Sequence, residues 1–425
     1  MTDKTIVSSG YGVVWIEMAG ITTPFTTPTF PFLQTVTQRS LDSLAPAFVL
    51  EKGPSAAPLA PTADAGLGQG VFSVNGTLGS GYVRQWNVAV QREITRNTAL
   101  EIAYVGSKIT NVGIPDSNLN QLTVDQLAIG NPLLQSVPNP YFGVIPRSSS
   151  LGDPTISAAQ LLKPYPRYTT VSLYRNNVGT TRYDGLEVGV RRRMSRGLFF
   201  SAAYTRSKLM DDASSVFDAS ILTGPVANFQ IADSHDLSRE RDYSTGDIPH
   251  VFVASVVWDV PFGKGRAQDL TGWLGVIAND WTASTFVTLQ SGVPIAVTQV
   301  TNFNAFAGFG TQRPNLVGNP ELPADQRTPD HWFNSAAFTI APQFTLGTAS
   351  RNPVRGPSYR NVDLAVVRGI ELGGRLTAQV RVEVFNLFNR ANLGAPAAVA
   401  GASNFGTITT ALDPRVVQLA VKVLF

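Results

Sequence analysis

The chain has 425 residues, of which 43% are apolar and only 15% are charged, against roughly 25% charged in an average soluble domain. Its 33 basic and 30 acidic residues give a net charge of +3, a small excess that argues against a nucleic-acid partner. The absence of Cys excludes disulfides, thiolate nucleophiles and Cys-ligated zinc, and we expect no cofactor.

No helical membrane span or secretion signal is predicted. No apolar run approaches the ~18 residues that a membrane-spanning helix needs. The first segment, "MTDKTIVSSGYGVVWIEM", has no basic region followed by an apolar one, so we do not predict a signal peptide. The abundance of Gly, Ser, Thr, Asn, Gln and Pro suits extended strands and long polar loops better than packed helices.

Apolar and polar residues alternate along much of the chain, which predicts strands with two chemically different faces. The clearest case is "RLTAQVRVEVFNLFN", where even positions from Leu376 to Val384 are apolar and odd positions from Arg375 to Glu383 are polar or charged. Many such runs reach about 10 residues or more, near the ~9–11 that a tilted strand needs to cross a bilayer. In chain order we predict ten strands at 6–17, 82–94, 98–107, 182–194, 197–208, 249–261, 280–291, 359–370, 375–388 and 413–425.

Long and short connections alternate between these strands. The short ones are the turns "TRN", "SRG" and "ELGG", and "PFGKGRAQDLTGWLGVIAND" is an intermediate link on the same side. The long ones are rich in Pro, Gly, Asn and Ser, and we expect them to be structureless loops at 18–81, 108–181, 209–248, 292–357 and 389–412. A compact soluble domain rarely carries several such loops, whereas an outer-membrane barrel with long extracellular loops does so routinely. The segment "YTTVSLYR" (168–175) would break the alternation as a crossing strand, so we predict that it forms a hairpin with the extension of the next strand.

The alternation assigns each side chain to lipid or lumen, because a barrel in a bilayer is apolar outside and can be wet inside. We predict as lipid-facing Val380, Val382, Val384, Val417, Leu419, Val421 and Val423. We predict as lumen-facing Arg191, Arg193, Arg375, Gln379, Arg381, Glu383, Gln418 and Lys422. The terminal Phe425 resembles the C-terminal sorting signal that the barrel assembly machinery reads.

Several segments resemble a known family, in order and over almost the whole chain. They include "YVRQWNVAVQREITRNTALEIAYVGSK", "YDGLEVGVRRRMSRGLFFSAAYTRSKLMDDASS", "DIPHVFVASVVWDVPFGKGR", "VTLQSGVPIAV", "RPNLVG", "WFNSAAF", "RNPVRGPSYRNVDLAVVR", "VRVEVFNLFNRANLGAP" and "DPRVVQLAVKVLF". This series resembles the strand units of TonB-dependent receptors of the Oar-like class.

The resemblance implies an antiparallel transmembrane β-barrel in the cell outer membrane, with about 22 strands and an N-terminal plug. Ten strands are about half of such a barrel, so we interpret residues 1–425 as its C-terminal part, without signal peptide or plug domain. The implied partners are outer-membrane lipid, the barrel assembly machinery and the TonB complex, the last through a plug missing from this chain. The implied function is TonB-coupled uptake, not enzymatic catalysis. Siderophore, cobalamin, glycan and peptide ligands all remain open.

Weaker motifs are better explained as structural. His235, His250 and His331 lack a metal-binding spacing. "DSHD" (233–236) suggests a hydrolase with Ser234, but neighbours in an extended chain point to opposite sides. "MDDASSVFD", with Asp211, Asp212 and Asp218, lacks the spacing of a calcium loop, and "FGKG" (262–265) lacks that of a phosphate-binding loop. The aromatic residues near strand ends are candidates for interfacial girdles: Tyr82, Trp86, Tyr104, Trp258, Phe262 and Trp281.

Two other classes of protein remain open. A soluble or surface-displayed β-sandwich adhesin, or a polysaccharide-binding protein of this fold whose loops bind the polysaccharide, would also show alternating strands. It would seal their apolar faces between two sheets. An enzyme within the long loops has little support, since no nucleophile and base share an informative spacing.

Overall fold

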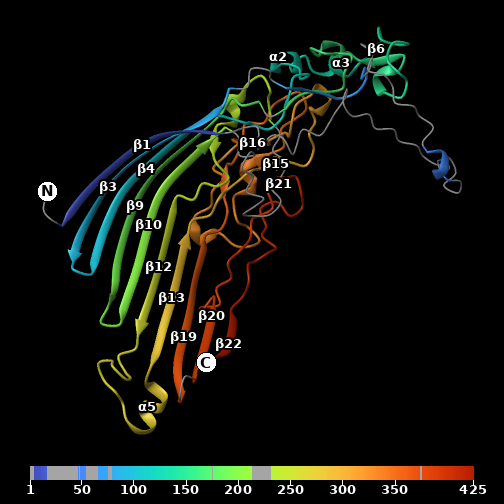
Figure 1. Ribbon diagram of the computed structural model, residues 1–425. Helices are drawn as coiled ribbons and strands as arrows, with labels where there is room; N and C mark the ends of the chain where they lie inside the picture. Colours follow the sequence, from blue (N-terminus) through green and yellow to red (C-terminus); the bar gives the residue numbers. More distant parts are fainter. Residues whose placement is uncertain are drawn as a thin grey trace.

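Ten long antiparallel strands form one continuous sheet, with a layer of loops at one end (Figure 1). The computed structural model describes residues 4–16, 46, 48–53, 66–74, 79–174, 176–212, 231–373 and 376–425. The ten strands are the predicted ones, in the predicted order, and each hydrogen-bonds to the next along the chain. Their bounds are β1 (Thr5–Ile16), β3 (Gly81–Thr95), β4 (Thr98–Val112), β9 (Gly179–Ser195), β10 (Leu198–Asp211), β12 (His250–Asp259), β13 (Trp281–Gln290), β19 (Tyr359–Gly373), β20 (Leu376–Phe385) and β22 (Val416–Leu424).

The predicted alternation of long and short connections is confirmed. The short turns lie at the end of the sheet opposite the loop layer (Figure 1). Between β9 and β10 the turn consists of Arg196 and Gly197, both with positive φ (52° and 74°), the geometry that matches the twist of a two-residue hairpin. This turn fixes the register of the two strands, apart from a bulge that follows Leu198. We call the two ends of the sheet the short-turn end and the loop end.

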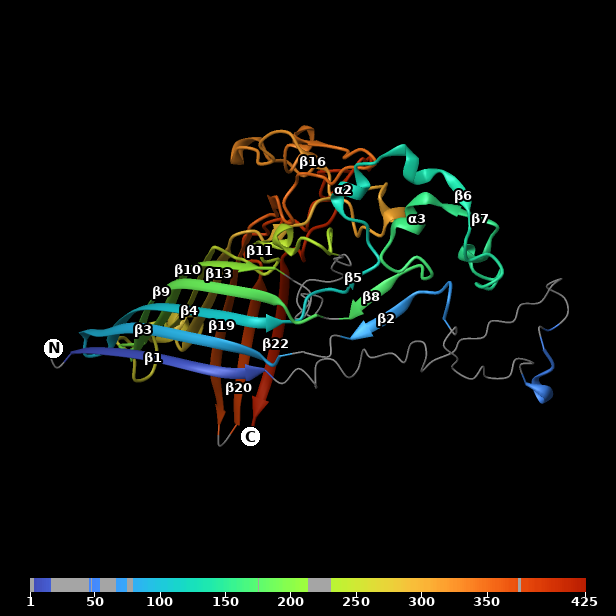
Figure 2. The same cartoon turned by 90° about the horizontal axis from the view of Figure 1, so that it is seen from above.

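The sheet is curved, and the direction of its strands changes steadily from β1 to β22 (Figure 2). Within the described residues, β1 pairs only with β3 and β22 pairs only with β20. The first and last strands therefore each have one edge without a partner strand in the described part of the chain. The sheet is an open, curved wall of ten strands rather than a closed ring.

The long connections are not structureless, which corrects the sequence prediction. They contain short strands and helices, and their described residues form four hydrophobic clusters. The three larger ones are centred on Phe333, Leu127 and Ile145, and a smaller one joins Ile114, Ile231 and Leu237. Among the described apolar side chains that are fully buried, only Ala103 and Val112 belong to the ten long strands. The hydrophobic core therefore lies in the loop layer, where chain segments pack on one another. The sheet itself leaves most of its side chains accessible.

Most of the shorter elements belong to this loop layer. Its strands are β2 (Val71–Val74), β5 (Ser117–Asn118), β6 (Ser136–Pro138), β7 (Thr155–Ser157), β8 (Val171–Tyr174), β14 (Pro294–Ile295), β15 (Thr298–Gln299), β16 (Asn315–Leu316), β17 (Phe338–Thr339), β18 (Val354–Arg355) and β21 (Val399–Ala400). The short strand β11 (Asp242–Tyr243) instead pairs with the end of β10 and so extends the large sheet. Its α-helices are α2 (Val124–Leu127) and α3 (Ala158–Leu162). The 3-10 helices are η2 (Leu50–Lys52), η3 (Asn131–Leu134), η4 (Ser150–Gly152), η5 (Leu237–Glu240), η6 (Ala305–Ala307), η7 (Ala324–Gln326) and η8 (Ser335–Ala337).

The segment 168–175 does not form the predicted hairpin. Its strand β8 pairs in parallel with β2 and antiparallel with β5, giving a three-stranded sheet within the loop layer. The extension of β9 instead pairs with β4, through Thr180 and Thr110. The alternating residues of β8 thus belong to a strand, but the partners of that strand come from distant loop segments.

The intermediate link between β12 and β13 contains one helix, α5 (Gly272–Ala278), at the short-turn end (Figure 1). The helix is tied to the sheet by Arg368, which donates to the carbonyl of Val276. The indole Nε1 of Trp281 donates to the carbonyl of Ile277 at 2.7 Å. Among the described residues, no helix combines the length and the apolar character required to span a bilayer.

Candidate functional site: a two-faced wall and its loop layer

The register of the sheet divides its side chains into two faces. Residues directly opposite each other in antiparallel strands project from the same side, so a face can be followed from strand to strand. Val380 lies opposite Val421, Val382 opposite Leu419 and Val384 opposite Val417. The residues predicted to face lipid therefore share one face, which we call the outer face.

Apolar side chains continue across the outer face of the other strands. Following the register from β20 back to β1 places on this face Val366 and Leu364 of β19, Val287 of β13, Val256 and Phe252 of β12, Phe200 and Tyr204 of β10, Val188 and Val190 of β9, Ile102 of β4, Val88 and Val90 of β3, and Val7 of β1. Charged residues on the same face lie nearer the strand ends, as Arg84 and Lys108 do toward the loop end. An apolar band bounded by charges is the pattern expected of a bilayer-facing wall.

The outer face is not covered by another layer of protein. Leu419 and Val421 are 75% and 70% exposed, although both are strand residues in register with other apolar side chains. A β-sandwich would bury this set against a second sheet. None lies over it in the described part of the chain, so the structure lacks the sealed apolar face that the adhesin alternative requires.

The predicted lumen-facing residues share the opposite, inner face. Gln379 lies opposite Lys422, and Glu383 lies opposite Gln418. Arg381 is 3.4 Å from Glu383 on the same strand, as an ion pair. Following the register across the sheet places Arg191 on the inner face as well, opposite Ser201. Arg193 is two residues further along the same strand and therefore projects from the same face. Arg375 lies outside the described residues. Which face meets lipid stays a prediction.

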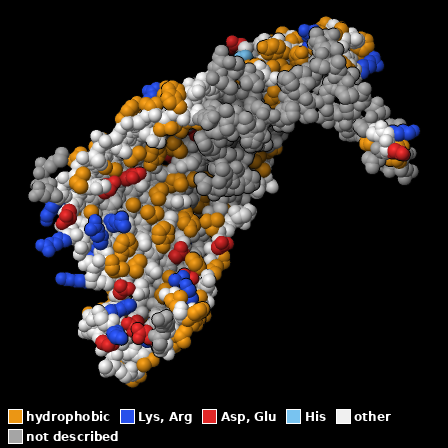
Figure 3. Space-filling view, in the orientation of Figure 1, with side chains coloured by type: hydrophobic (Ala, Val, Ile, Leu, Met, Phe, Trp, Pro, Cys, Tyr) orange, Lys and Arg blue, Asp and Glu red, His pale blue; other side chains and the backbone are white. Residues whose placement is uncertain are grey.

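A charged hollow of about 760 Å³ lies on the inner face toward the short-turn end. Its lining includes Glu101, Glu187, Arg191 and Arg193, from β4 and β9. The amide of Gln91 donates to the Glu101 carboxylate at 2.6 Å, which links β3 to β4 across the hollow. On the face seen in Figure 3, most charged side chains also lie toward the short-turn end.

The inner face is less polar in the middle of the wall. On β12 the residues Val251, Val253 and Val257 point to this side, opposite Gln290, Thr288 and Ser284 of β13. Phe286, on the same face of β13, is 48% exposed. β12 is thus apolar on both faces, which explains why its sequence alternates less cleanly than its neighbours. An apolar patch on the inner face can bind another protein surface.

The predicted aromatic girdle residues lie largely on the outer face, but not all at strand ends. Tyr82, Trp258 and Trp281 are at or next to strand termini. Tyr104 lies in the middle of β4, because this strand continues to Val112, five residues beyond its predicted end. The ring of Trp86 covers Gly106, its register partner, where an added Cβ would lie 2.3 Å from the indole.

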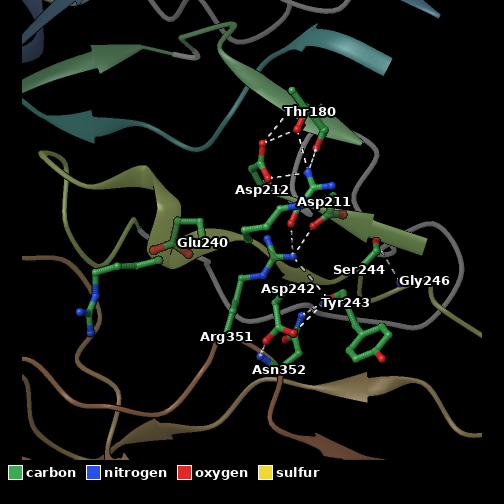
Figure 4. A network of polar contacts seen from close by, with 12 residues as sticks. Thr180, Asp211, Asp212, Glu240, Asp242, Tyr243, Ser244, Gly246, Arg351 and Asn352 are labelled. Carbon is green, nitrogen blue, oxygen red and sulfur yellow. Dashed lines mark hydrogen bonds and ion pairs between the residues drawn. The ribbon is translucent and has the colours of Figure 1, made fainter. Parts of the chain in front are cut away.

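At the loop end, a buried ionic network ties the loops to the strands (Figure 4). The guanidinium of Arg351 forms an ion pair with Asp211, the last residue of β10, and both side chains are at most 6% exposed. The same guanidinium donates to the Asp211 carbonyl at 3.2 Å and to that of Tyr243 at 3.4 Å. Beside it, the backbone N–H of Asn352 donates to Asp242 at 2.7 Å. The loop after β13 is thereby fixed to β10 and β11.

Three further arginine–carboxylate pairs extend this network. Arg241 donates to Asp212 at 2.8 Å and to the Thr180 hydroxyl at 2.7 Å. The carboxylate of Asp212 also accepts from the backbone N–H and the hydroxyl of Thr180. The other pairs are Arg313 with Glu240, and Arg355 with Asp247 at 2.5 Å. Burial lowers the pKa of Arg313, while Glu240 acts in the opposite direction.

The network accounts for the acidic motif that suggested calcium. Asp211 and Asp212 bind arginines from distant loops, and Asp218 lies outside the described residues. No group of three potential metal-ligating side chains is found among the described residues. The arginine partners could not be identified from the sequence. Arg351 is 140 residues from Asp211, and neither belongs to a motif that names the other.

The hydrolase motif is also used structurally. Ser234 Oγ accepts the backbone N–H of Asn118 at 3.0 Å. His235 Nε2 contacts the carbonyl of Gln121 at 3.1 Å, and Asp233 accepts from the Gln121 amide at 2.6 Å. The three side chains therefore hold the segment 233–236 against the chain near Gln121, and the described contacts do not couple Ser234 to His235. The "FGKG" motif lies in the link after β12, where Gly263 and Gly265 have positive φ.

Several solved structures match the chain, each at low identity. The outer membrane transporter YddB from Escherichia coli matches with a TM-score of 0.39 and 11% identity, over 83% of this chain and 34% of its own. The FrpB iron transporter from Neisseria meningitidis matches with 0.36 and 11%, over 83% and 33%. FpvA of P. aeruginosa, solved with bound pyoverdines, matches with 0.38 and 10%, over 99% and 31%. The chain thus spans about a third of the length of these structures. No curated protein matches it.

A family model described as an outer membrane beta barrel domain matches residues 1–418, nearly the whole chain. This match agrees with the antiparallel sheet, its long strands and its uncovered apolar face. The chain therefore belongs to the outer membrane beta barrel domain family and is a protein of the outer membrane.

Proposed function

We propose that this chain forms part of the wall and the extracellular loops of a TonB-dependent receptor of the Oar-like class, which takes up a ligand across the outer membrane. The observation that carries the proposal is the open ten-stranded wall with an apolar outer face and a charged inner face. Unpaired strand edges are costly in lipid, because no water is present to hydrogen-bond the backbone. The edges of β1 and β22 therefore favour further strands that complete a wider barrel.

The inner face supports the presence of a plug. A lumen filled only with water would favour polar side chains throughout, whereas Val251, Val253 and Phe286 present apolar surface to it. The charged hollow with Glu101, Glu187, Arg191 and Arg193 offers ion pairs beside this patch. We propose that a plug domain packs here and transmits the TonB-dependent signal, and that the barrel assembly machinery inserts the wall by way of the segment ending in Phe425. No catalytic role is proposed.

A pair of arginine substitutions on opposite faces of β20 tests the proposal. Val382→Arg places a charge on the outer face between Val366 and Leu419, and it should destabilise the inserted wall by about 2–4 kcal/mol if this site is at mid-membrane. Gln379→Arg, on the inner face of the same strand, should be tolerated. Both variants are refolded in detergent, and assembly is measured by the heat-modifiable mobility of the folded band. Assembly of Val382→Arg to the same high yield as Gln379→Arg would contradict the proposed membrane-facing wall.

A further inference from the structure

A pocket of about 440 Å³ lies within the loop layer, away from the charged hollow of the wall. Five separate parts of the chain contribute to it: Asn118 of β5, Lys163 at the end of α3, Thr170 and Ser172 beside and on β8, Ser234 shortly before η5, and Phe309 just after η6. Phe309 lines the pocket and belongs to the hydrophobic cluster of Leu127 and Ala307, which fixes this side of the pocket. The pocket is thus built by the fold of several loops.

Lys163 is the cation of this lining. The residue is only 8% exposed, and no opposite charge within the described residues offsets the effect of burial on its ammonium group. A buried ammonium is normally paired, because removing it from water is costly. Burial lowers the pKa of Lys163 to about 8, so the side chain is still largely protonated at neutral pH. The pocket therefore contains a positive charge that is not held in an ion pair within the described part of the chain.

The rest of the lining can donate hydrogen bonds. Thr169, Thr170 and Ser172 all line the pocket. Their hydroxyls form no hydrogen bond within the described part of the chain. Ser234 Oγ accepts one hydrogen bond and keeps its own proton to donate. The lining also includes one carboxylate, that of Asp116, and this residue already interacts with another group. Hydroxyl donors around one ammonium form a site for a group that carries negative charge on oxygen.

We propose that this pocket binds a compact oxyanion, a carboxylate or a phosphate group, with Lys163 as its counter-charge and the hydroxyls of Thr170 and Ser172 as donors. The inference rests on the proposed receptor function, in which the oxyanion is the part of the incoming ligand that the loops recognise. It assigns the loop layer a preference for anionic ligands, which the wall alone does not provide.

The test uses the full chain, refolded in detergent and reductively methylated with ¹³C-formaldehyde, so that each lysine gives an NMR signal. The Lys163 signal is assigned by its loss in Lys163→Arg. Inorganic phosphate and acetate are titrated separately in buffer free of other oxyanions. The proposal expects a saturable shift of the Lys163 signal with at least one of them, and an unmoved signal for Lys108, which lies on the outer face of the sheet. An unmoved Lys163 signal with both probes overturns it.

Calorimetric titration of unmodified variants gives a second reading. Lys163→Met should weaken binding of the active probe at least tenfold, and Thr170→Val should weaken it less, while Lys163→Arg should retain most of it. Equal affinity in wild type and Lys163→Met would contradict the proposal. Heat-modifiable mobility, recorded on each preparation, shows that the variant is folded.

The same preparation separates this inference from the proposed function. A chain that inserts in membranes but binds neither probe overturns the oxyanion site alone. A chain that binds a probe through Lys163 but tolerates Val382→Arg as well as Gln379→Arg overturns the receptor wall alone.

Discussion

At the scale of single residues, buried charge distinguishes the loop layer from the wall. The wall places charged residues such as Arg381 and Glu383 where water can reach them. At the loop end, Arg351 and Glu240 of the loop layer are buried, together with Asp211, the last residue of β10. A buried ion pair contributes little net stability relative to an apolar pair, but it is costly to break, because one charge is left alone. Such pairs therefore hold the loops in one arrangement over the strand ends.

Breaking the central pair should release the loop after β13. Arg351→Met leaves the Asp211 carboxylate buried without its guanidinium, which should cost about 3–5 kcal/mol. We expect faster proteolytic cleavage within residues 292–357, measured by mass spectrometry of the folded chain in detergent. The matched control is Arg327→Met, whose partner Glu321 is 4.0 Å away and exposed, and it should change stability by less than about 1 kcal/mol. Similar cleavage in both variants would contradict a structural role for the buried pair.

The unpartnered Lys163 predicts a pH-dependent penalty. Its pKa is about 8 in the folded chain against an ordinary value of 10.5, so the unfolded chain binds more protons between these values. The stability of the loop layer should therefore rise as the pH rises from about 8 to about 10.5. Lys163→Met should stabilise this layer by up to about 3 kcal/mol at pH 7, and the gain should vanish above about pH 10.5. Urea midpoints at a series of pH values, in buffer free of phosphate and carboxylates, measure this. If the stability gained in Lys163→Met were the same at every pH, the buried ammonium of Lys163 would not be its cause.

At the scale of elements, the strands could be predicted from the sequence and the loop layer could not. The alternation of apolar and polar residues was sufficient to place β20 and β22, because successive side chains on a strand point to opposite faces. The largest boundary difference is in β4, whose extension to Val112 depends on pairing with β9 rather than on its own composition. The same holds for β8, which alternates like a hairpin strand but pairs with β2 and β5.

The candidate sites divide in the same way. The members of the lumen-facing and lipid-facing sets that the structure describes fall on opposite faces, since a face follows from residue parity. The ionic network and the Lys163 pocket combine residues from loops far apart in the chain, and no local spacing indicates that Arg351 meets Asp211 or that Lys163 lies near Ser172. Tertiary packing alone brings these groups together.

The helix α5 gives a prediction at this scale. Trp273, Val276 and Ile277 are 72%, 70% and 61% exposed, and the helix is bound to Arg368 and Trp281, both on the outer face of the wall. If the outer face meets lipid, as we propose, an exposed apolar helix beside it should lie in the membrane interface. In vesicles, lipids brominated near the headgroup should quench the fluorescence component that Trp273→Phe removes. An unquenched Trp273 would place the helix in water.

At the scale of the whole molecule, the fold separates two tasks. The ten-stranded wall has little core of its own and exposes a continuous apolar face, while the loop layer contains the hydrophobic clusters and the buried charges. Hydrocarbon around the outer face would supply the apolar contacts that a second protein layer supplies in a soluble protein. The loop layer, held by its own core, can keep a binding surface fixed at one end of the wall.

The most direct test is a scan of β22 for side-chain environment in lipid vesicles. Since the chain has no native Cys, each of residues 416–424 can be replaced singly by Cys and labelled with a nitroxide. Collision rates with oxygen, which concentrates in lipid, and with a water-soluble nickel chelate are then measured by electron paramagnetic resonance. We predict high oxygen accessibility at 417, 419, 421 and 423, and high chelate accessibility at 418, 420 and 422. Accessibility that does not alternate along the strand, or chelate access at every position, would contradict a wall with one face in lipid.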